Sequence, residues 1–348
     1  MRKIEYSFLD NGMLPSGFIN ITSDIAYFKA SSQIRQYEYS TTYNVLKKQA
    51  ILNSVKSSNA IEGIYTTDER LSSIVNRNDA PQTHSEEELI GYKNALDSIH
   101  QGYKFIDFTE NSIKRLHRTM LNIPGYENIG EYKQEDNVIT ETYDGKTRIA
   151  YIPVSAKETP EAMKQLILAY EEAANNPRIN RLILIPCVIL DFLCIHPFND
   201  GNGRISRLLS LLLLYKEGHN VVGYISFERQ IEKIKSKYYE ALQKSSLNWE
   251  KGANDYFPFI ENFLTCLYMS YKDLDIRFGS ENQYKKATKS ERIQGLIDNM
   301  IIPVSKSEIC EMLPDISPTT VESVLGNMVK NNEVSKIGQG KNTKYIKK

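Results

Sequence analysis

His196-Pro197-Phe198-Asn199-Asp200-Gly201-Asn202-Gly203-Arg204-Ile205-Ser206-Arg207 is the stretch of sequence that organises this chain. It is polar and lies between two strongly apolar segments, Leu182–Ile195 and Leu208–Tyr215. Apolar runs of this length are too short to span a bilayer and are typical of buried helices. Pro186 is expected either to kink the first helix or to start its second half. The sequence therefore predicts a polar loop that rigid core holds on both sides.

Two glycines in this loop, Gly201 and Gly203, allow backbone angles that other residues resist. Successive N–H groups can therefore curl into a concave nest that binds an anion. A helix that begins at Arg204 would point its free N–H groups and a partial positive charge at the same anion. Arg204 and Arg207 lie on one face of that first turn, where two guanidinium groups can bind phosphate oxygens. This part of the loop predicts a phosphate site.

Two further side chains of the loop suit the same ligand. Asp200 supplies a hard oxygen for Mg²⁺, which prefers one or two carboxylates together with substrate phosphates. His196, at the edge of the loop, is a candidate general base. Together these residues predict a nucleoside triphosphate, its magnesium ion and a proton acceptor for an attacking hydroxyl group.

The whole stretch matches the pattern HPFx(D/E)GNGRxxR without a gap and so resembles the Fic (Fic/Doc) family. The resemblance implies a mainly α fold, a Fic-type helical bundle with a β-hairpin flap, and Mg²⁺-dependent transfer of AMP from ATP to a protein hydroxyl. It also implies that His196 deprotonates the target, Phe198 anchors the loop and Asp200 holds the metal. The implied ATP-binding residues are Gly201, Asn202, Gly203, Arg204 and Arg207. The Doc branch lacks the Gly-Asn-Gly-Arg pattern and phosphorylates instead, so it fits less well.

A second motif is the helix end Ser58-Asn59-Ala60-Ile61-Glu62-Gly63, where Ser58 and Glu62 share one helical face. From the residues alone this is typical of a solvated helix end. Beside the loop motif, however, it resembles the (S/T)xxxE(G/N) pattern of the inhibitory helix found in the same family. The resemblance implies that Glu62 pairs with Arg207. A bidentate pair in a desolvated cleft would compete with the γ-phosphate of ATP for that guanidinium.

The remaining helices are predicted from apolar stripes and their caps. Residues 1 to about 40 predict an extended arm, followed by a helix that Ser40 or Thr41 caps. His117 is expected to pack or to position its helix. The other predicted helix starts and spans are the capping boxes Thr66/Glu69 and Ser85/Glu88, a cap near Thr109, Thr159-Pro160, Glu228–Leu247 and Asp255–Phe278.

The helical pattern fails between Gly125 and Pro153. Two β-prone runs, Val138–Tyr143 and Lys146–Ile152, flank Asp144-Gly145, which favours a tight primed turn. The resemblance implies that this hairpin is a flap that docks the target segment as an added strand. The expected docking residues are Val138, Ile139, Tyr151 and Ile152.

The C-terminal segment, residues 285–348, predicts three short helices and a Gly-turned hairpin, an order that resembles a winged helix. It carries eleven Lys/Arg against seven Asp/Glu, and the excess lies mainly in the hairpin. The expected recognition helix has only Lys330 and also carries Glu322. Tight DNA binding is therefore not expected, and protein contact or dimerisation fits at least as well.

Composition limits the function classes. The chain has 348 residues with 43 basic and 43 acidic side chains, so no overall charge attracts nucleic acid or a membrane. Its N-terminal residues lack the apolar core of a signal peptide. The four cysteines have no metal-type spacing and are expected to be reduced core residues, which favours a cytoplasmic protein. They are Cys187, Cys194, Cys266 and Cys310.

The leading hypothesis is an adenylyltransferase whose partners are ATP and a hydroxyl-bearing target protein, with the chain itself one candidate target. The expected parts are residues 1–110 with the inhibitory helix, the catalytic core 111–278 and the winged-helix-like unit 285–348. Two alternatives stay open. The same site could remove AMP from a modified protein, or the chain could be a DNA-binding regulator with a nucleotide-sensing core. A homodimer also stays open.

Overall fold

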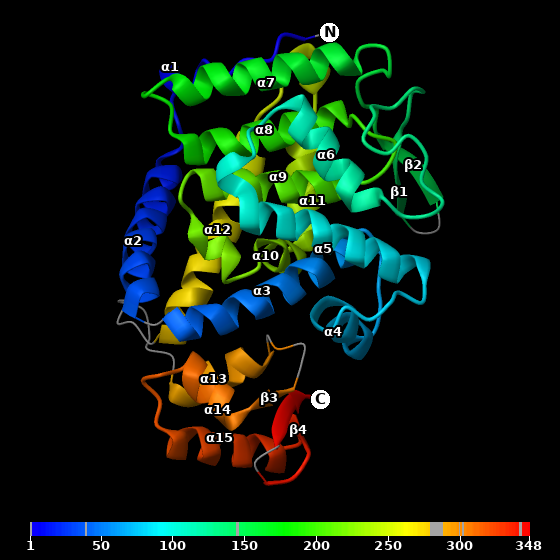
Figure 1. The fold of residues 1–348 in the computed structure, drawn as a ribbon. Coiled ribbons are helices and arrows are strands. Elements are labelled where there is room, and N and C mark those ends of the chain that lie inside the picture. The colour runs from blue at the N-terminus through cyan, green and yellow to red at the C-terminus, as the bar shows by residue number, and fades with distance from the viewer. Residues whose placement is uncertain are drawn as a thin grey trace.

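The apolar segment before the loop forms α8 (Arg181–Ile195), which is buried along its length from Leu182 onward and contains Pro186 in its interior. The loop leads into α9 (Asn202–Lys216), which packs against α8. In the computed structural model both helices lie in the middle of the molecule, with α5 and α6 covering one side (Figure 1). The structure describes residues 2–38, 40–143, 146–278, 288–298, 300, 303–340 and 343–348.

The fold is mainly helical, as predicted, and the surrounding helices bury the α8–α9 pair because each turns an apolar face inward. The α-helices around it are α1 (Phe8–Asn11), α2 (Ser16–Glu38), α3 (Ser40–Ile61), α4 (Asp68–Asn76), α5 (His84–Gly102), α6 (Glu110–Leu121), α7 (Thr159–Asn175), α10 (Phe227–Lys233), α11 (Lys235–Ser246) and α12 (Phe257–Phe278). Three short 3₁₀ helices are η1 (Tyr103–Phe105), η2 (Asn220–Gly223) and η3 (Trp249–Lys251).

The prediction of an extended N-terminal arm is wrong, because most of it forms the long helix α2. Phe18, Ile25 and Phe28 are buried on the side that contacts α12. Ile19 and Ile34 are each 65% exposed on the rest of the helix. These outward apolar residues blur the period of the inner stripe, so the sequence does not display a clean amphipathic pattern.

Several predicted helix boundaries shift. The caps expected at Thr66 and Ser85 are wrong, since the Thr67 and Thr83 side chains cap α4 and α5 instead. Neighbouring Ser and Thr residues satisfy the same capping pattern, so sequence alone does not choose between them.

Two more boundaries differ from the prediction, and one agrees. Thr109 caps α6 as expected. Thr159 is the first residue of α7 rather than its cap, and its hydroxyl donates to the carbonyl of Ser155. The single helix expected over Glu228–Leu247 is interrupted at Ile234.

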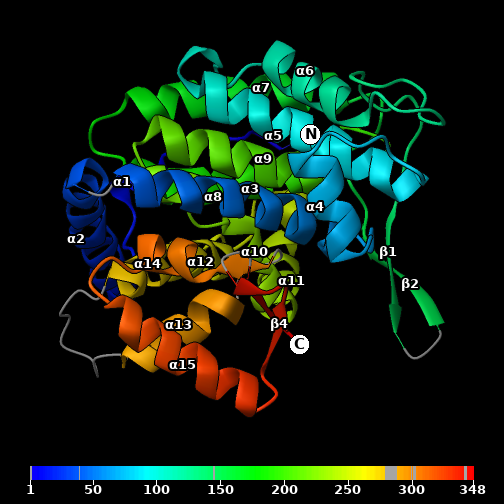
Figure 2. The same cartoon turned by 60° about the horizontal axis from the view of Figure 1, so that its bottom comes forward.

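The predicted hairpin is present as antiparallel β1 (Ile139–Tyr143) and β2 (Lys146–Tyr151), with Ile139 opposite Tyr151. The expected turn, Asp144-Gly145, lies outside the described residues. Figure 2 shows the two strands projecting from the helical body. The hairpin therefore has little core of its own.

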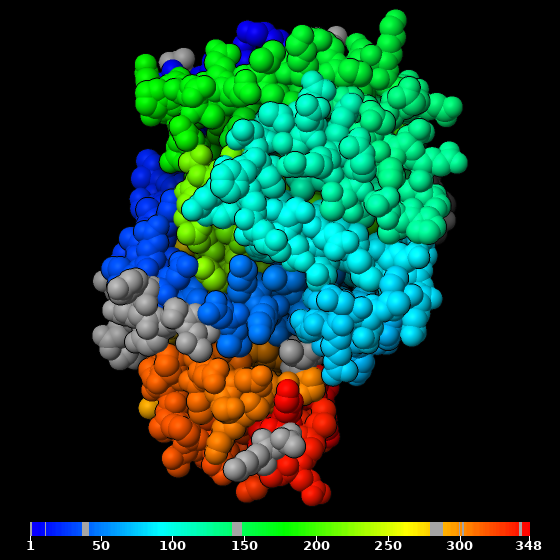
Figure 3. All heavy atoms as spheres, in the orientation of Figure 1, coloured from blue at the N-terminus to red at the C-terminus, as the bar shows by residue number. Residues whose placement is uncertain are grey.

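The C-terminal segment folds into a small unit beside α3 (Figure 3), and its helix α14 contacts α3. Its elements are α13 (Lys289–Asp298), β3 (Val304–Ser305), α14 (Lys306–Met312), α15 (Pro318–Lys330), β4 (Val334–Ile337) and β5 (Lys344–Lys347). The strands form an antiparallel sheet in the order β3-β5-β4. The three helices and the antiparallel β4–β5 pair that the sequence predicts are present, and the winged-helix likeness stays a prediction.

All four cysteines are free, and Cys310 is partly exposed, unlike the three in the main body. Among the described residues, none of the helices has both the length and the apolarity needed to cross a bilayer.

Candidate active site

His196 ends α8 in the left-handed conformation, with φ 52° and ψ 61°, and its N–H donates to the carbonyl of Phe192. A residue other than glycine rarely adopts this conformation, so the fold must hold it there. Burial lowers the pKa of the imidazole to about 4, and the positive charge of Lys133 acts in the same direction. At neutral pH the ring is therefore uncharged and able to accept a proton.

The loop after His196 is fixed from inside. Phe198 is fully buried and stacks on His117, with ring centroids 3.8 Å apart. The side chain of Asn202 accepts from the N–H of Phe198 at 3.0 Å and donates to its carbonyl at 2.8 Å. Phe198 thus anchors the loop in the core, and Asn202 closes it.

His117 does more than pack. Its Nδ1 accepts from the backbone N–H of Gly130 at 2.9 Å, which assigns the ring proton to Nε2. Nε2 then donates to the carbonyl of Asp200 at 3.0 Å. His117 is therefore a second imidazole that touches the loop, and it ties the loop to α6.

The prediction of special backbone angles is right for Gly201 and wrong for Gly203, which lies within α9, because that helix begins at Asn202 rather than at Arg204. Gly201 has φ 77°, and its carbonyl accepts from the N–H of Ile205. The N–H groups of α9 before Ile205 therefore have no acceptor within the helix and point out of its N-terminus. A Cβ atom on Gly203 would lie 2.3 Å from a carboxylate oxygen of Glu62. The carboxylate of Glu62 therefore lies against the backbone of Gly203, at the helix N-terminus where an anion would bind.

Arg207 and Glu62 come together as the motif implied. Nη2 of Arg207, a residue 2% exposed, donates to Oε1 of Glu62 at 2.7 Å. The bidentate geometry expected for this pair is wrong, because the remaining bonds go to Ser58: Nε to Oγ at 2.8 Å and Nη2 to the carbonyl at 2.9 Å. Burial opposes the charge on Arg207, but Glu62 and its other neighbours keep the pKa of the guanidinium above its usual value.

Arg204 is held by Glu88, a partner that the sequence reading missed. Nη1 of Arg204 donates to Oε2 of Glu88, and Nη2 lies 3.3 Å from Oδ2 of Asp200. Tyr126 donates to the same oxygen of Glu88 at 3.0 Å. The expected capping box gave Glu88 a different role, and no local signal linked it to an arginine 116 positions away.

Asp200 is the predicted metal ligand, and its side chain is 55% exposed at the mouth of the loop. Its Oδ1 accepts from the N–H of Gly201 at 2.6 Å. Among the described residues there is no group of three or more His, Cys, Asp or Glu side chains arranged to hold a metal. A magnesium ion here would therefore depend on one protein carboxylate together with phosphate and water oxygens, which suits Mg²⁺.

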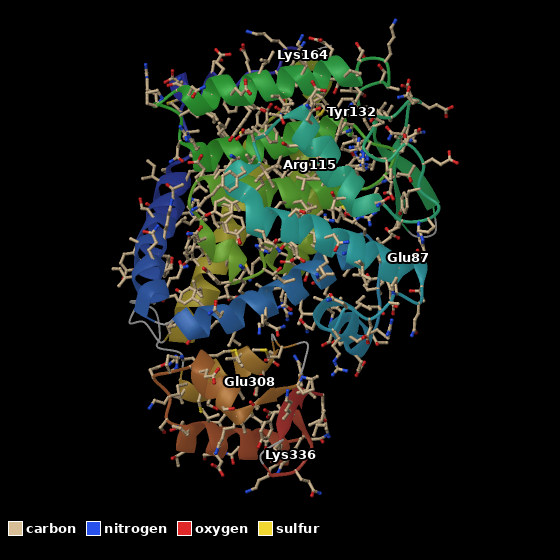
Figure 4. All side chains as sticks on the ribbon, in the orientation of Figure 1. Glu87, Arg115, Tyr132, Lys164, Glu308 and Lys336 are labelled. Carbon is tan, nitrogen blue, oxygen red and sulfur yellow. The ribbon has the colours of Figure 1, made fainter. Side chains whose placement is uncertain are left out.

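Lys133 and Asn137 were also missed. The ammonium of Lys133 donates to Oδ1 of Asn137 at 2.9 Å and lies 3.4 Å from the carbonyl of Ile195. Asn137 in turn donates to the carbonyl of Phe198. Tyr132, the residue before Lys133, lies beside α6 (Figure 4). A lysine buried in a segment without regular structure gives no periodic signal in the sequence.

The predicted docking residues lie along the hairpin and its ends. Val138 is 51% exposed and Ile152 67% exposed, just outside the strands. Ile139 and Tyr151 pair across the strands and are half-buried. Ile149, which was not predicted, is 58% exposed on β2.

Comparison with known proteins supports the motif. The model of the Fic/DOC family matches residues 107–214. The protein adenylyltransferase Fic of Drosophila melanogaster is 27% identical over 237 residues, which are 66% of this chain and 42% of that protein. The chain thus spans less than half the length of the curated relatives it matches first.

Solved structures share the fold. A Fic family protein from Desulfovibrio desulfuricans matches with a TM-score of 0.61 over 97% of both chains, at 17% identity. A Fic domain containing signaling protein from Bacteroides thetaiotaomicron matches with a TM-score of 0.61 at 26% identity, over 73% of this chain and 94% of that chain.

Proposed function

We propose, from the premise that residues 107–214 of this chain are a Fic/DOC family domain, that the protein transfers AMP from ATP to a hydroxyl group of a target protein. One observation carries the proposal. The same loop bears a neutral imidazole at His196 and the open N-terminus of α9, so a proton acceptor and an anion site adjoin. Similarity to the adenylyltransferase Fic of Drosophila melanogaster supports the same reaction.

The reaction needs a base and a held phosphate chain. The target hydroxyl oxygen forms a bond to the α-phosphorus of ATP, the bond from that phosphorus to the oxygen bridging the β-phosphate breaks, and pyrophosphate leaves. The hydroxyl proton passes to the imidazole of His196. The N–H groups at the start of α9 face the phosphate oxygens on which negative charge increases.

The arginines and Asp200 suit the outer phosphates. From the family resemblance we propose that Arg204 binds on the β-phosphate side and Arg207 binds the γ-phosphate, since guanidinium groups suit phosphate oxygens. The exposed carboxylate of Asp200 would hold a magnesium ion together with phosphate and water oxygens. When bound, the metal neutralises phosphate charge.

We further propose that Glu62 inhibits this reaction within the chain. Its carboxylate accepts a bond from Arg207 and lies against Gly203, so it adds negative charge where the γ-phosphate would bind. The two Ser58 bonds hold Arg207 in place independently of Glu62. Removal of Glu62 alone would therefore release a cation that is already positioned.

The target segment is proposed to add to the β1–β2 hairpin as a further strand. Val138, Ile149 and Ile152 are each more than half exposed there, which provides apolar contacts for an extended chain. Backbone pairing with an exposed strand edge recognises an extended segment with few demands on its sequence.

The experiment incubates the purified chain and a cell lysate with ATP labelled at the α-phosphate. We expect label on protein with Glu62→Gly, less with wild type, and none with His196→Ala. Glu69→Gly is the matched control, since Glu69 is also an exposed glutamate near a helix end. Label from ATP carrying the isotope at the γ-phosphate, and none from the α-labelled nucleotide, would instead indicate phosphorylation.

A further inference from the structure

The backbone around His196 is held by a short segment that the proposed chemistry does not yet use. The N–H of Lys133 donates to the carbonyl of Pro197 at 2.9 Å, and its ammonium lies 3.4 Å from the carbonyl of Ile195. Asn137 reaches the carbonyl of Phe198 at 3.4 Å. The carbonyl groups of Ile195, Pro197 and Phe198, which lie before and after His196 in the chain, thus accept hydrogen bonds from Lys133 and Asn137.

These hydrogen bonds can stabilise the strained backbone of His196. The residue has a positive φ, a strained conformation for a residue other than glycine, which persists only when its surroundings enforce it. The carbonyl groups at the end of a helix such as α8 also lack partners within the helix. Lys133 supplies a donor at that helix end.

Lys133 is an unusual choice for a simple packing role. The residue is 2% exposed, and among the described residues no carboxylate lies within ion-pair distance of its ammonium. Burial lowers the pKa of this lysine to about 8, with Asp136 acting in the opposite direction. A buried unpaired charge costs free energy that a methionine of similar size would avoid.

We propose that Lys133 is a positioning residue for His196, which holds the backbone of the loop and keeps a positive charge next to the imidazole. The inference rests on the proposed function for its effect on rate, but not for its effect on the imidazole. Three charged groups act on His196: Lys133, Glu62 and Asp200. Burial is the largest cause that lowers the pKa of His196, Lys133 acts in the same direction, and Glu62 and Asp200 act in the opposite one.

The test measures the pKa of His196 by NMR on the full chain labelled with ¹³C at its five histidines. The signal of His196 is identified because it is missing from the spectrum of His196→Gln. In Lys133→Met, we expect the pKa of His196 to rise by about half a unit to one unit, because a neighbouring cation no longer disfavours the imidazolium. Lys114→Met is the matched control, since Lys114 lies over the ring of Tyr132 and reaches Glu131 rather than the loop.

Two further readouts separate positioning from packing. We expect the rate of AMP transfer by Lys133→Met to fall roughly 10- to 100-fold, as a displaced catalytic group does, while the nucleotide Kd changes less than twofold. The melting temperature should not fall. Lys133→Arg, which keeps charge and donors, should restore the wild-type pKa of His196. If Lys133→Met does not fold, Lys133→Gln takes the same measurements.

An unchanged His196 titration in a folded Lys133→Met variant overturns the inference, whatever happens to activity. If the titration shifts but neither wild type nor Glu62→Gly labels any protein, the positioning role stands and the proposed function fails. If labelling occurs and Lys133→Met labels at the wild-type rate with an unshifted titration, the proposed function stands alone.

Discussion

Replacing Glu62 with glycine is the perturbation that tests how this site is controlled. In the structure Arg207 is buried and makes three hydrogen bonds, of which one goes to Glu62 and two go to Ser58. The substitution removes the first and leaves the others. Arg207 should therefore remain at the loop with its charge available to the γ-phosphate of ATP.

The expected gain follows from that one bond. A hydrogen bond to a charged group contributes about 1.5–3 kcal/mol. The side chain of Glu62 is 32% exposed, so solvent screens the pair and we use the lower half of the range, about 1.5–2.2 kcal/mol. At about 1.36 kcal/mol for each factor of ten, this corresponds to a roughly 10- to 40-fold faster transfer of AMP.

The assay is a double-mutant cycle on the rate of labelled-AMP incorporation, with wild type, Glu62→Gly, Arg207→Ala and the double variant. Glu62 inhibits through Arg207, and Arg207 helps when it reaches the γ-phosphate, so the two effects should not add. We expect the double variant to lose the gain of Glu62→Gly. Self-modification on a Tyr, Ser or Thr is the simplest readout.

Two results would refute this reasoning. One is a Glu62→Gly variant that is folded and binds ATP but gains no activity toward any protein. The other is a double variant that stays as fast as Glu62→Gly alone. Either would leave the contact between Glu62 and Arg207 as an ordinary helix-end ion pair.

The other predictions concern the base, the metal and the C-terminal unit. His196→Ala should abolish AMP transfer while retaining nucleotide binding. Because the pKa of His196 is lowered to about 4, the rate of AMP transfer by Glu62→Gly should stay constant from pH 8 to about 5 and fall below pH 5 as the ring takes up a proton. A steep fall in that rate between pH 7 and 6 would contradict this. Asp200→Ala should lower the rate and raise the Mg²⁺ concentration needed for half-maximal activity, and an unaltered Mg²⁺ titration would remove Asp200 as the ligand. The full chain should bind duplex DNA only weakly, and fluorescence anisotropy that shows tight binding with a steep dependence on salt would favour the regulator hypothesis instead.

Much of the centre of this protein could be predicted because its signals are local. The apolar runs before and after residues 196–207 predicted α8 and α9, and two β-prone runs that flank Asp144-Gly145 predicted β1 and β2. Gly201, at φ 77°, marked the tight backbone at the end of the loop, whereas Gly203 lies within α9. Each signal depends on neighbouring positions in the chain, which is why sequence reading captures it.

The parts of the fold that were predicted wrongly depend on contacts between distant positions or on local signals shared by neighbouring residues. Helix α2 was missed because its inner stripe can be recognised only when α12 shows which face is buried. The caps at Thr67 and Thr83 were displaced because adjacent hydroxyl residues satisfy the same local pattern.

The sequence by itself determined the loop, and its resemblance to the Fic family implied the pairing of Glu62 with Arg207 that the structure contains. Only the tertiary structure decided how each charge is held. Arg204 donates to Glu88, two of the Arg207 hydrogen bonds go to Ser58, and the ammonium of Lys133 lies near the last carbonyl of α8. These contacts join positions from 62 to 149 residues apart, so they depend on the packing of helices and loops, and no local pattern in the chain records which buried charge faces which.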